Sequence, residues 1–214
     1  MMNAFTYTKR EEIINAITHG IGAIFSIVAL TLLIVFASSH GTPLHIICFA
    51  VFGGSMLLLY TSSTLVHSFP EGKVKDIFEI MDHSAIYLFI AGSYTPILLI
   101  VVKGALGWAL FGTVWGIALA GVAFKIFFTK RFVILSTVGY VLMGWMIIFA
   151  FNRVVLTLPQ QGLAWLIGGG ILYTVGAIFY VWRKFPFNHA IWHLFVLAGS
   201  TSHFILMFYI LKLS

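Results

Sequence analysis

The chain has 214 residues, of which 61% are hydrophobic and only 8% are charged, and its formal net charge is +6. A soluble domain of this length carries roughly a quarter charged residues, so the composition excludes a soluble enzyme and predicts a polytopic membrane protein. The single cysteine, Cys48, also excludes an intramolecular disulfide.

Seven apolar runs follow one another along the chain, and each is long enough to cross a bilayer core of about 30 Å. Helices are expected for all of them, because backbone polar groups in lipid must be satisfied within the segment. We therefore predict an all-α membrane protein, a single seven-transmembrane helix bundle that occupies residues 1–214. The runs cover approximately residues 18–36, 44–66, 80–102, 106–128, 132–151, 163–182 and 190–211.

Proline and glycine refine this arrangement. Four of the five prolines lie in connections between the runs, but Pro96 lies inside the third run and predicts a kink there. Gly112 and Gly116 form a G-x-x-x-G pair, and Gly168–Gly170 are consecutive. Small residues let helix backbones approach closely in lipid, so we expect these glycines at helix contacts.

The basic residues are divided unequally between the two sides of the membrane, which predicts a cytosolic N-terminus and an external C-terminus. We expect a multi-pass protein of the inner (plasma) membrane. Contact with anionic lipid headgroups accounts for the remaining positive charge, so we expect no nucleic-acid partner. Nine basic residues share the side of the N-terminus (Lys9, Arg10, Lys73, Lys75, Lys125, Lys130, Arg131, Arg183 and Lys184), and three lie on the other side (Lys103, Arg153 and Lys212).

This topology places polar residues from three distant segments at one membrane depth. Ser63 and His67 end the second run, Asp82 begins the third, and His189 and His193 begin the seventh. Residues i and i+4 of a helix share a face, so His189 and His193 can point at one centre. Three neutral imidazoles with one open position form the ligand set of a catalytic zinc site. We predict Zn²⁺ held by His67, His189 and His193, with Asp82 beside it to orient a water or take its proton.

Each of these histidines has a structural alternative, because a single imidazole near a membrane surface more often caps a helix or reaches the interface. His40 and His45, on the opposite side, fit that alternative. His203 should lie about 15 Å deeper than His193, and we expect it to form a hydrogen bond between helices. His83 points about 100° away from Asp82 and is expected outside the metal site.

The motifs together resemble the progestin and adipoQ receptor family, and the short chain is most similar to its bacterial hemolysin III branch. Adiponectin receptors belong to the same group, which is more distantly related to alkaline ceramidases, regarded as metal-dependent membrane hydrolases. The resemblance extends from Glu12 to His203. It rests on "EIINAITH" with Glu12, Asn15, Thr18 and His19, on Ser63-x-x-x-His67, on "DHSAIYLFIAGSYTP", and on His189-x-x-x-His193.

This resemblance implies a seven-helix bundle with zinc at the positions of His67, His189 and His193. It also implies that Asp82 and Ser63 stand beside the water on that zinc, as catalytic residues. The sequence departs from the animal receptors because it has no soluble domain that could bind a protein hormone, so we expect no hormone partner.

Four functions are compatible with these features. The first is a zinc-dependent hydrolase, amidase-like or ceramidase-like, that acts on a membrane lipid amide or ester and contributes to lipid homeostasis. The second is a non-catalytic sensor or regulator of the membrane with a structural zinc. A pore-forming hemolysin is disfavoured, because the chain is too apolar to be secreted as a soluble monomer. A transporter is disfavoured because Asp82 is the only charged residue expected within a span. Membrane lipids are the expected partners.

Overall fold

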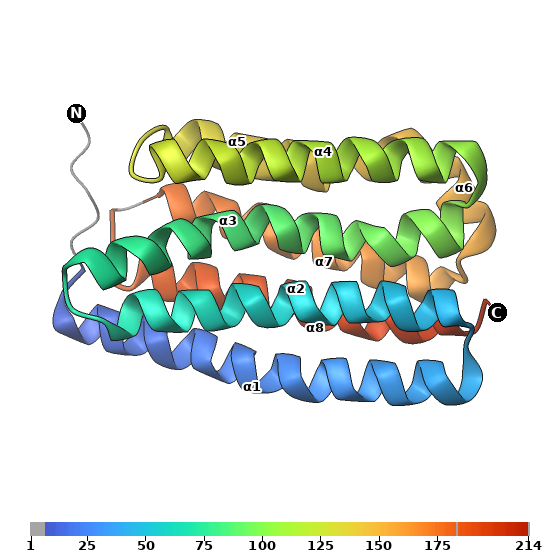
Figure 1. The fold of residues 1–214 in the computed structure, drawn as a ribbon, viewed down its shortest axis with the longest axis horizontal. Coiled ribbons are helices and arrows are strands. Elements are labelled where there is room, and N and C mark those ends of the chain that lie inside the picture. The colour runs from blue at the N-terminus through green and yellow to red at the C-terminus, as the bar shows by residue number, and fades with distance from the viewer. Residues whose placement is uncertain (1–6, 183, 214) are drawn as a thin grey trace.

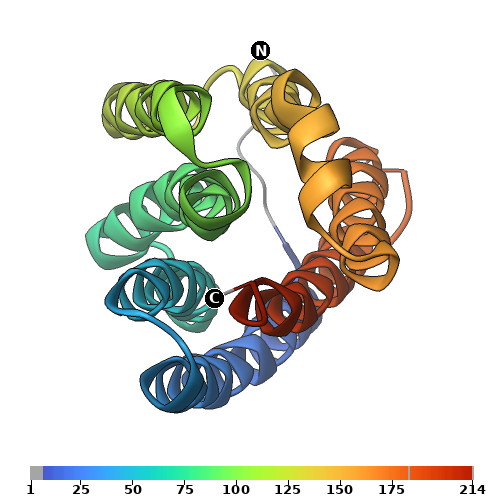
Figure 2. The same cartoon turned by 90° about the vertical axis from the view of Figure 1, so that its right-hand side faces the viewer.

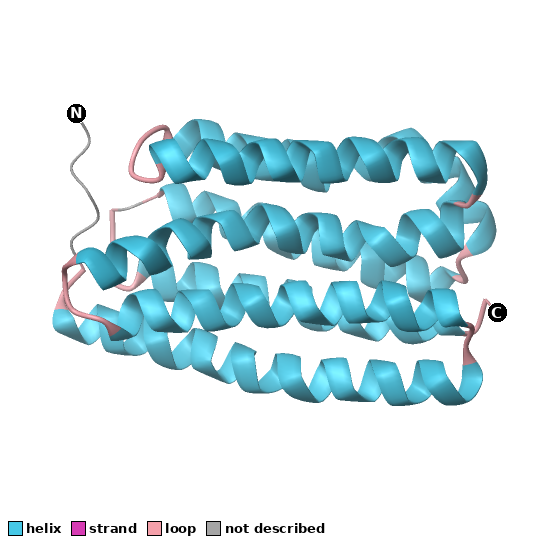
Figure 3. Cartoon of the chain, viewed as in Figure 1, coloured by secondary structure: helices cyan, strands magenta, loops and turns pink. Residues whose placement is uncertain are grey.

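The computed structural model describes residues 7–182 and 184–213. Within these ranges seven helical segments are long and apolar enough to cross a membrane, which confirms the seven-span all-α bundle. Figure 1 shows the spans side by side along the long axis, with α1 beginning at one end of the bundle and α8 ending at the other. The described residues form only helices and connecting loops (Figure 3).

The third and fifth spans are composite, whereas the others are single α-helices. The third span joins α3 to a π-helix, and the fifth joins α5, a short 3-10 helix and α6. The segments in chain order are α1 (Lys9–His40), α2 (Pro43–Ser68), α3 (Lys73–Pro96), a π-helix (Ile97–Val102), α4 (Gly104–Phe128), α5 (Val133–Gly144), a 3-10 helix (Met146–Ala150), α6 (Phe151–Thr157), α7 (Gln160–Val181) and α8 (Asn188–Leu211).

Helix α1 begins at Lys9, well before the expected start of the first span at residue 18. A capping box starts it: the Thr8 hydroxyl accepts a hydrogen bond from the Glu11 backbone N–H, and the Glu11 carboxylate accepts one from the Thr8 backbone N–H. Such reciprocal bonds satisfy backbone donors at a helix start. The added turns matter for function, because they carry Glu12 into the polar cluster described below.

Two local breaks have identifiable causes. Pro96 lacks a backbone N–H, and the chain changes from α-helix to π-helix directly after it, at the point where the sequence predicted a kink. The second break follows Gly144, where α5 ends. There the Tyr94 hydroxyl donates to the Gly144 carbonyl oxygen at 2.6 Å and accepts from the Ile147 backbone N–H at 2.8 Å. These bonds replace helical ones within the membrane.

The helices are not packed equally. Helix α1 packs against α2 and α8, while α7 packs against α8, and α4 lies at the edge against α3 (Figure 2). At Gly22 of α1, an added Cβ atom would lie 2.3 Å from Cδ1 of Tyr60, so only glycine permits this approach to α2. Gly112 and Gly116, by contrast, have no atom within 4 Å of an added Cβ. The expectation that they lie at a helix contact was wrong, because that side of α4 faces away from the bundle.

The two groups of basic residues lie at opposite ends of the bundle. Arg183 is outside the described residues, and the other eight members of the larger group lie where α1, α3 and α8 begin and α4 ends. Lys103, Arg153 and Lys212 lie at the other end. This separation agrees with the charge pattern, while the assignment of the cytosolic side remains a prediction.

Candidate metal centre

The three predicted ligands come together at the end of the bundle where α1 begins. His67 lies in the last turn of α2, and His189 and His193 lie in the first turns of α8. All three are buried, and one ring nitrogen from each lies within 4.8 Å of the others, which is close enough to hold a metal ion. The closest pair is Nε2 of His67 and Nε2 of His189, which are 3.2 Å apart.

The nitrogen donors fit a metal ion on chemical grounds. Nε2 of His193 is buried and has no hydrogen-bond partner among the described residues, although buried polar atoms nearly always have one. Imidazole nitrogens suit zinc, copper and nickel among the common divalent ions. No fourth histidine, cysteine or carboxylate within residues 7–182 and 184–213 joins the group.

His67 and His193 have further polar contacts outside the three-histidine group. The second ring nitrogen of His67, Nδ1, lies 2.6 Å from a carboxylate oxygen of Glu12, and Lys75 Nζ lies 2.5 Å from the other oxygen. Nδ1 of His193 lies 2.9 Å from the Thr18 hydroxyl. The arrangement resembles the outer contacts that orient metal-binding histidines in other proteins.

Asp82 and Ser63 are buried near this centre but do not belong to the group of three. Ser63 lies one turn before His67 on the same face of α2, since the residues have an i, i+4 spacing. Its hydroxyl interacts with the Asp82 carboxylate. Neither Ser63 Oγ nor Asp82 Oδ1 has a formed hydrogen bond within the described part of the chain. Both groups therefore retain the capacity to bind a polar substrate atom or a water.

His83, His203 and His45 lie where the sequence placed them, outside the centre. Nδ1 of His83 donates to the Glu79 carbonyl oxygen at 2.8 Å, and its Nε2 lies 3.2 Å from the Tyr180 hydroxyl. Nε2 of His203 donates to a carbonyl oxygen of α7, that of Leu166, at 3.4 Å. His45 caps α2, because its Nδ1 accepts from the Thr42 backbone N–H at 3.2 Å.

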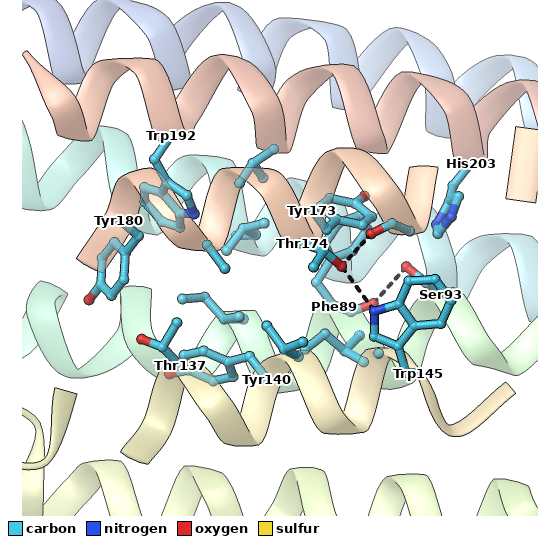
Figure 4. A pocket seen from close by; sticks show the side chains of 18 of the residues that line it. Phe89, Ser93, Thr137, Tyr140, Trp145, Tyr173, Thr174, Tyr180, Trp192 and His203 are labelled. Carbon is cyan, nitrogen blue, oxygen red and sulfur yellow. Dashed lines mark hydrogen bonds between the residues drawn. The ribbon is translucent and has the colours of Figure 1, made fainter. Parts of the chain in front are cut away.

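A cavity of about 130 Å³ lies beside the centre, among α3, α5, α7 and α8. Figure 4 shows Trp192 and Tyr180 at one end of it, and Trp145 and His203 at the other. The Trp192 ring lies 4.8 Å from that of His189 and 5.0 Å from that of His193. The cavity thus ends at Trp192, whose ring contacts two of the three ligands. Sequence reasoning could not find it, because its mostly apolar lining has the composition of an ordinary core.

The structure also contains ionic contacts near the centre that the sequence did not predict. Lys125 lies within α4 and is only 1% exposed, so Asp82 is not the only charged residue inside a span. Its electrostatic partner is Glu79 of α3. In the connection after α4, Lys130 donates to the Asp76 carboxylate at 2.6 Å, and this hydrogen bond raises the pKa of the lysine. These contacts hold α3 and α4 together at the end that carries the centre.

Helix α1 contributes the residues that the topology argument missed. Glu12 and Thr18 contact ligands, and His19 stacks on His193 with ring centroids 3.4 Å apart and an interplanar angle of 15°. All three residues occur in "EIINAITH". That motif was the available signal, but the sequence alone gave no reason to assign it to the centre.

Comparison with known proteins places these residues in a broader group. The model of the family described as "Haemolysin-III related" matches residues 7–204. Hemolysin-3 of Bacillus cereus is 55% identical over 211 residues, which are 98% of this chain and 96% of that protein. The Hemolysin-3 homolog of Bacillus subtilis (strain 168) is 56% identical over 207 residues, covering 96% and 97%. The human monocyte to macrophage differentiation factor is 28% identical over 163 residues, covering 72% and 66%.

Proposed function

The chain belongs to the haemolysin-III-related family, and we propose that it is a metal-dependent hydrolase that cleaves an amide or ester bond of a membrane lipid. It is a multi-pass integral protein of the plasma membrane. Its similarity to the human monocyte to macrophage differentiation factor supports the wider relationship to the progestin and adipoQ receptor family. Zinc is the metal that we propose.

The number of ligands is the observation that carries this proposal. Within the described residues, the group contains three histidines and no fourth histidine, cysteine or carboxylate. Structural zinc sites are almost always closed by four protein ligands, whereas catalytic sites use three and keep one position for water or substrate. A ligand set of three therefore favours catalysis over a purely structural metal.

The side chains around the centre suit hydrolysis. When bound, zinc supplies Lewis acidity, polarising a carbonyl and lowering the pKa of water to about 7. We assign Asp82 the role of general base, since its carboxylate is buried and interacts with Ser63, one helical turn before His67. The Ser63 hydroxyl then donates a hydrogen bond to the oxygen that gains negative charge. A positioned base contributes about 10²–10⁴-fold to the rate, and an oxyanion donor contributes a similar factor.

The cavity supports a lipid as the substrate. Its lining is mainly apolar, and Trp192 and Tyr180 separate it from the ligands by the thickness of one aromatic ring layer. An acyl chain in this cavity would place its carbonyl group against this aromatic layer, one ring away from the ligands. Burial of the chain would also exclude bulk water from the reaction.

Two other functions have specific support. A structural metal would connect α2 to α8 and make the bundle a sensor or regulator of the membrane. The name of the Bacillus cereus relative, Hemolysin-3, favours membrane lysis. In the described residues, however, the three ligands lie at one end of the bundle, and the buried charged residues, Asp82 and Lys125, do not form a path across it.

Purified, zinc-loaded protein in vesicles of bacterial lipids provides the test. We expect release of fatty acid, detected by mass spectrometry, and at least a hundredfold slower release by Asp82→Asn. Asp76→Asn is the matched control, because Asp76 lies on the same helix but is exposed and pairs with Lys130. Full zinc content without any released product would overturn the hydrolase and favour the sensor. Leakage of an entrapped dye that is unchanged in Asp82→Asn would favour lysis.

A further inference from the structure

Helix α1 carries no predicted ligand, yet it contacts two of the three. From these contacts we infer that Glu12 and Thr18 are positioning residues that fix His67 and His193 as their Nδ1–H tautomers and direct both Nε2 atoms to the metal. The inference deepens the proposed function and rests on it for the presence of a metal, but not for the tautomers themselves. It assigns a role to the motif "EIINAITH".

The contact with Glu12 determines the tautomer of His67. One Glu12 oxygen lies 2.6 Å from Nδ1 of His67, and the other lies 2.5 Å from the Lys75 ammonium group. A carboxylate paired with a lysine can only accept hydrogen bonds, so Nδ1 of His67 must carry the proton and donate it. The lone pair is then on Nε2, which faces His189 at 3.2 Å.

The contact with Thr18 determines the tautomer of His193, because the Thr18 hydroxyl has only one hydrogen to donate. A hydroxyl group has one hydrogen, and Thr18 donates it within its own helix, to the carbonyl oxygens of Ile14 at 3.0 Å and Asn15 at 2.9 Å. With that hydrogen directed to the carbonyl oxygens, the same hydroxyl accepts from Nδ1 of His193, 2.9 Å away. Nδ1 therefore carries the proton, and the buried Nε2 presents a lone pair.

Ring stacking fixes the plane of the second ligand. The His19 ring lies flat against the His193 ring, and the edge of Tyr60 packs against His19 with centroids 4.9 Å apart. Tyr60 in turn fills the space that Gly22 leaves on α1. Rotation of the His193 ring would break the stack and the Thr18 hydrogen bond together. Helix α1 thus controls both the protonated nitrogen and the orientation of the ring.

Outer contacts of this kind change metal affinity by about 10–100-fold when they are removed. The informative variants are Glu12→Gln, which removes the carboxylate charge and turns one of its two acceptor oxygens into an N–H donor, and Thr18→Val, which deletes the hydroxyl. Both change the side-chain volume little. Thr18→Ser keeps the hydroxyl and should restore the wild-type behaviour. Glu71→Gln is the control for Glu12, because Glu71 pairs with the same Lys75 at 3.1 Å but is largely exposed. Thr31→Val is the control for Thr18, because its hydroxyl also donates within α1, at an exposed position.

Two measurements on the full-length protein in detergent test the inference. The first is ¹⁵N NMR of metal-free protein labelled at histidine, because ring ¹⁵N shifts report which nitrogen carries the proton. Signals are assigned with His67→Asn and His193→Asn. The second is zinc affinity by competition with a chelator. Circular dichroism identifies any variant that does not fold, and the Glu12 and Thr18 substitutions give independent results.

We expect Nδ1–H tautomers at both positions in the wild type, and loss of the respective tautomer in Glu12→Gln and Thr18→Val. We also expect about 10–100-fold weaker zinc binding by both variants, with Thr18→Ser, Glu71→Gln and Thr31→Val unchanged. Persistence of both tautomers in the folded variants would overturn the inference. If the tautomers depend on α1 but the wild type binds no zinc, the positioning role stands and the proposed metal function fails.

Discussion

Nε2 of His67 on α2 and Nε2 of His189 on α8 lie 3.2 Å apart, although the residues are separated by 122 positions in the sequence. Two nitrogen lone pairs at this distance repel each other unless a proton or a cation lies between them. A metal ion bound by both would join α2 to α8, two helices with few other direct contacts. The stability of the bundle should therefore depend on the metal.

Replacing any one ligand with alanine should reduce bound zinc. We expect one tightly bound zinc ion per chain in the wild type and much less in His67→Ala, His189→Ala or His193→Ala, measured by elemental analysis of purified protein. His45→Ala is the control, because His45 is also buried but caps α2 at the opposite end of the bundle. Unchanged zinc in the His67→Ala, His189→Ala double variant would contradict the ligand assignment.

Removal of the metal should lower the unfolding temperature. A ligand at one hundred times its dissociation constant stabilises the folded state by about 2.7 kcal/mol, and each kcal/mol corresponds to about 2–4 °C for a chain of this size. Chelation should therefore lower the midpoint by about 5–10 °C, and zinc should restore it. The His193→Ala variant should show no response to either treatment. An equal response in that variant would place the stabilising zinc elsewhere.

The charge distribution predicts orientation as well as fold. We expect reporter enzymes fused after residue 214 to be active only outside the cytosol, and fusions in the connection between α2 and α3 to be active only inside. The reason is the concentration of basic residues at the end where α1 begins. A cytosolic C-terminus would also move the metal centre to the outer leaflet, which would change the lipids available to it.

The sequence predicted the seven spans and the three-histidine group because both depend on simple rules. Apolar length defines a span, and alternating direction places the ends of the second, third and seventh spans on one side. The contacts of Glu12 and Thr18 could not be predicted in this way, since they depend on which face of α1 turns toward α2 and α8. That rotation is set by side-chain packing, such as Tyr60 against Gly22.

The errors have a related cause. Gly112 and Gly116 looked like contact residues because small residues often are, but α4 lies at the edge of the bundle and offers that face no neighbour. Asp82 was expected to be the only charged residue within a span, yet Lys125 is buried in α4 near Glu79. In both cases the residue type suggested an environment for the side chain. The actual environment depends on where α4 lies in the bundle, which only the tertiary structure defines.

Helices α1 and α2 approach closely at Gly22, and we expect a change in packing there to affect the metal centre. An added Cβ would lie 2.3 Å from the Tyr60 ring, so Gly22→Ala should displace Tyr60 and disturb the stack of His19 on His193. Overpacking of this kind costs about 1–3 kcal/mol, and we expect both a lower unfolding temperature and weaker zinc binding. Gly112→Ala, with open space around its Cβ, should change neither. Wild-type zinc affinity in a destabilised Gly22→Ala protein would show that metal binding does not depend on the stack of His19 on His193.

The final prediction concerns the cavity. It distinguishes a loss of substrate binding from a loss of the chemical step. Ala177 of α7 lines the cavity, and Ala177→Phe would place an aromatic ring where we propose that the acyl chain lies. Displacing the chain at a cost of about 1–3 kcal/mol would reduce kcat/KM for lipid hydrolysis roughly 5- to 150-fold. Zinc content should be unchanged, because Ala177 is not one of the three ligands. Asp82→Asn should instead lower kcat with little change in KM. If filling the cavity leaves kcat/KM unchanged while Asp82→Asn abolishes turnover, the substrate reaches the metal by another route and the acyl chain does not occupy this cavity.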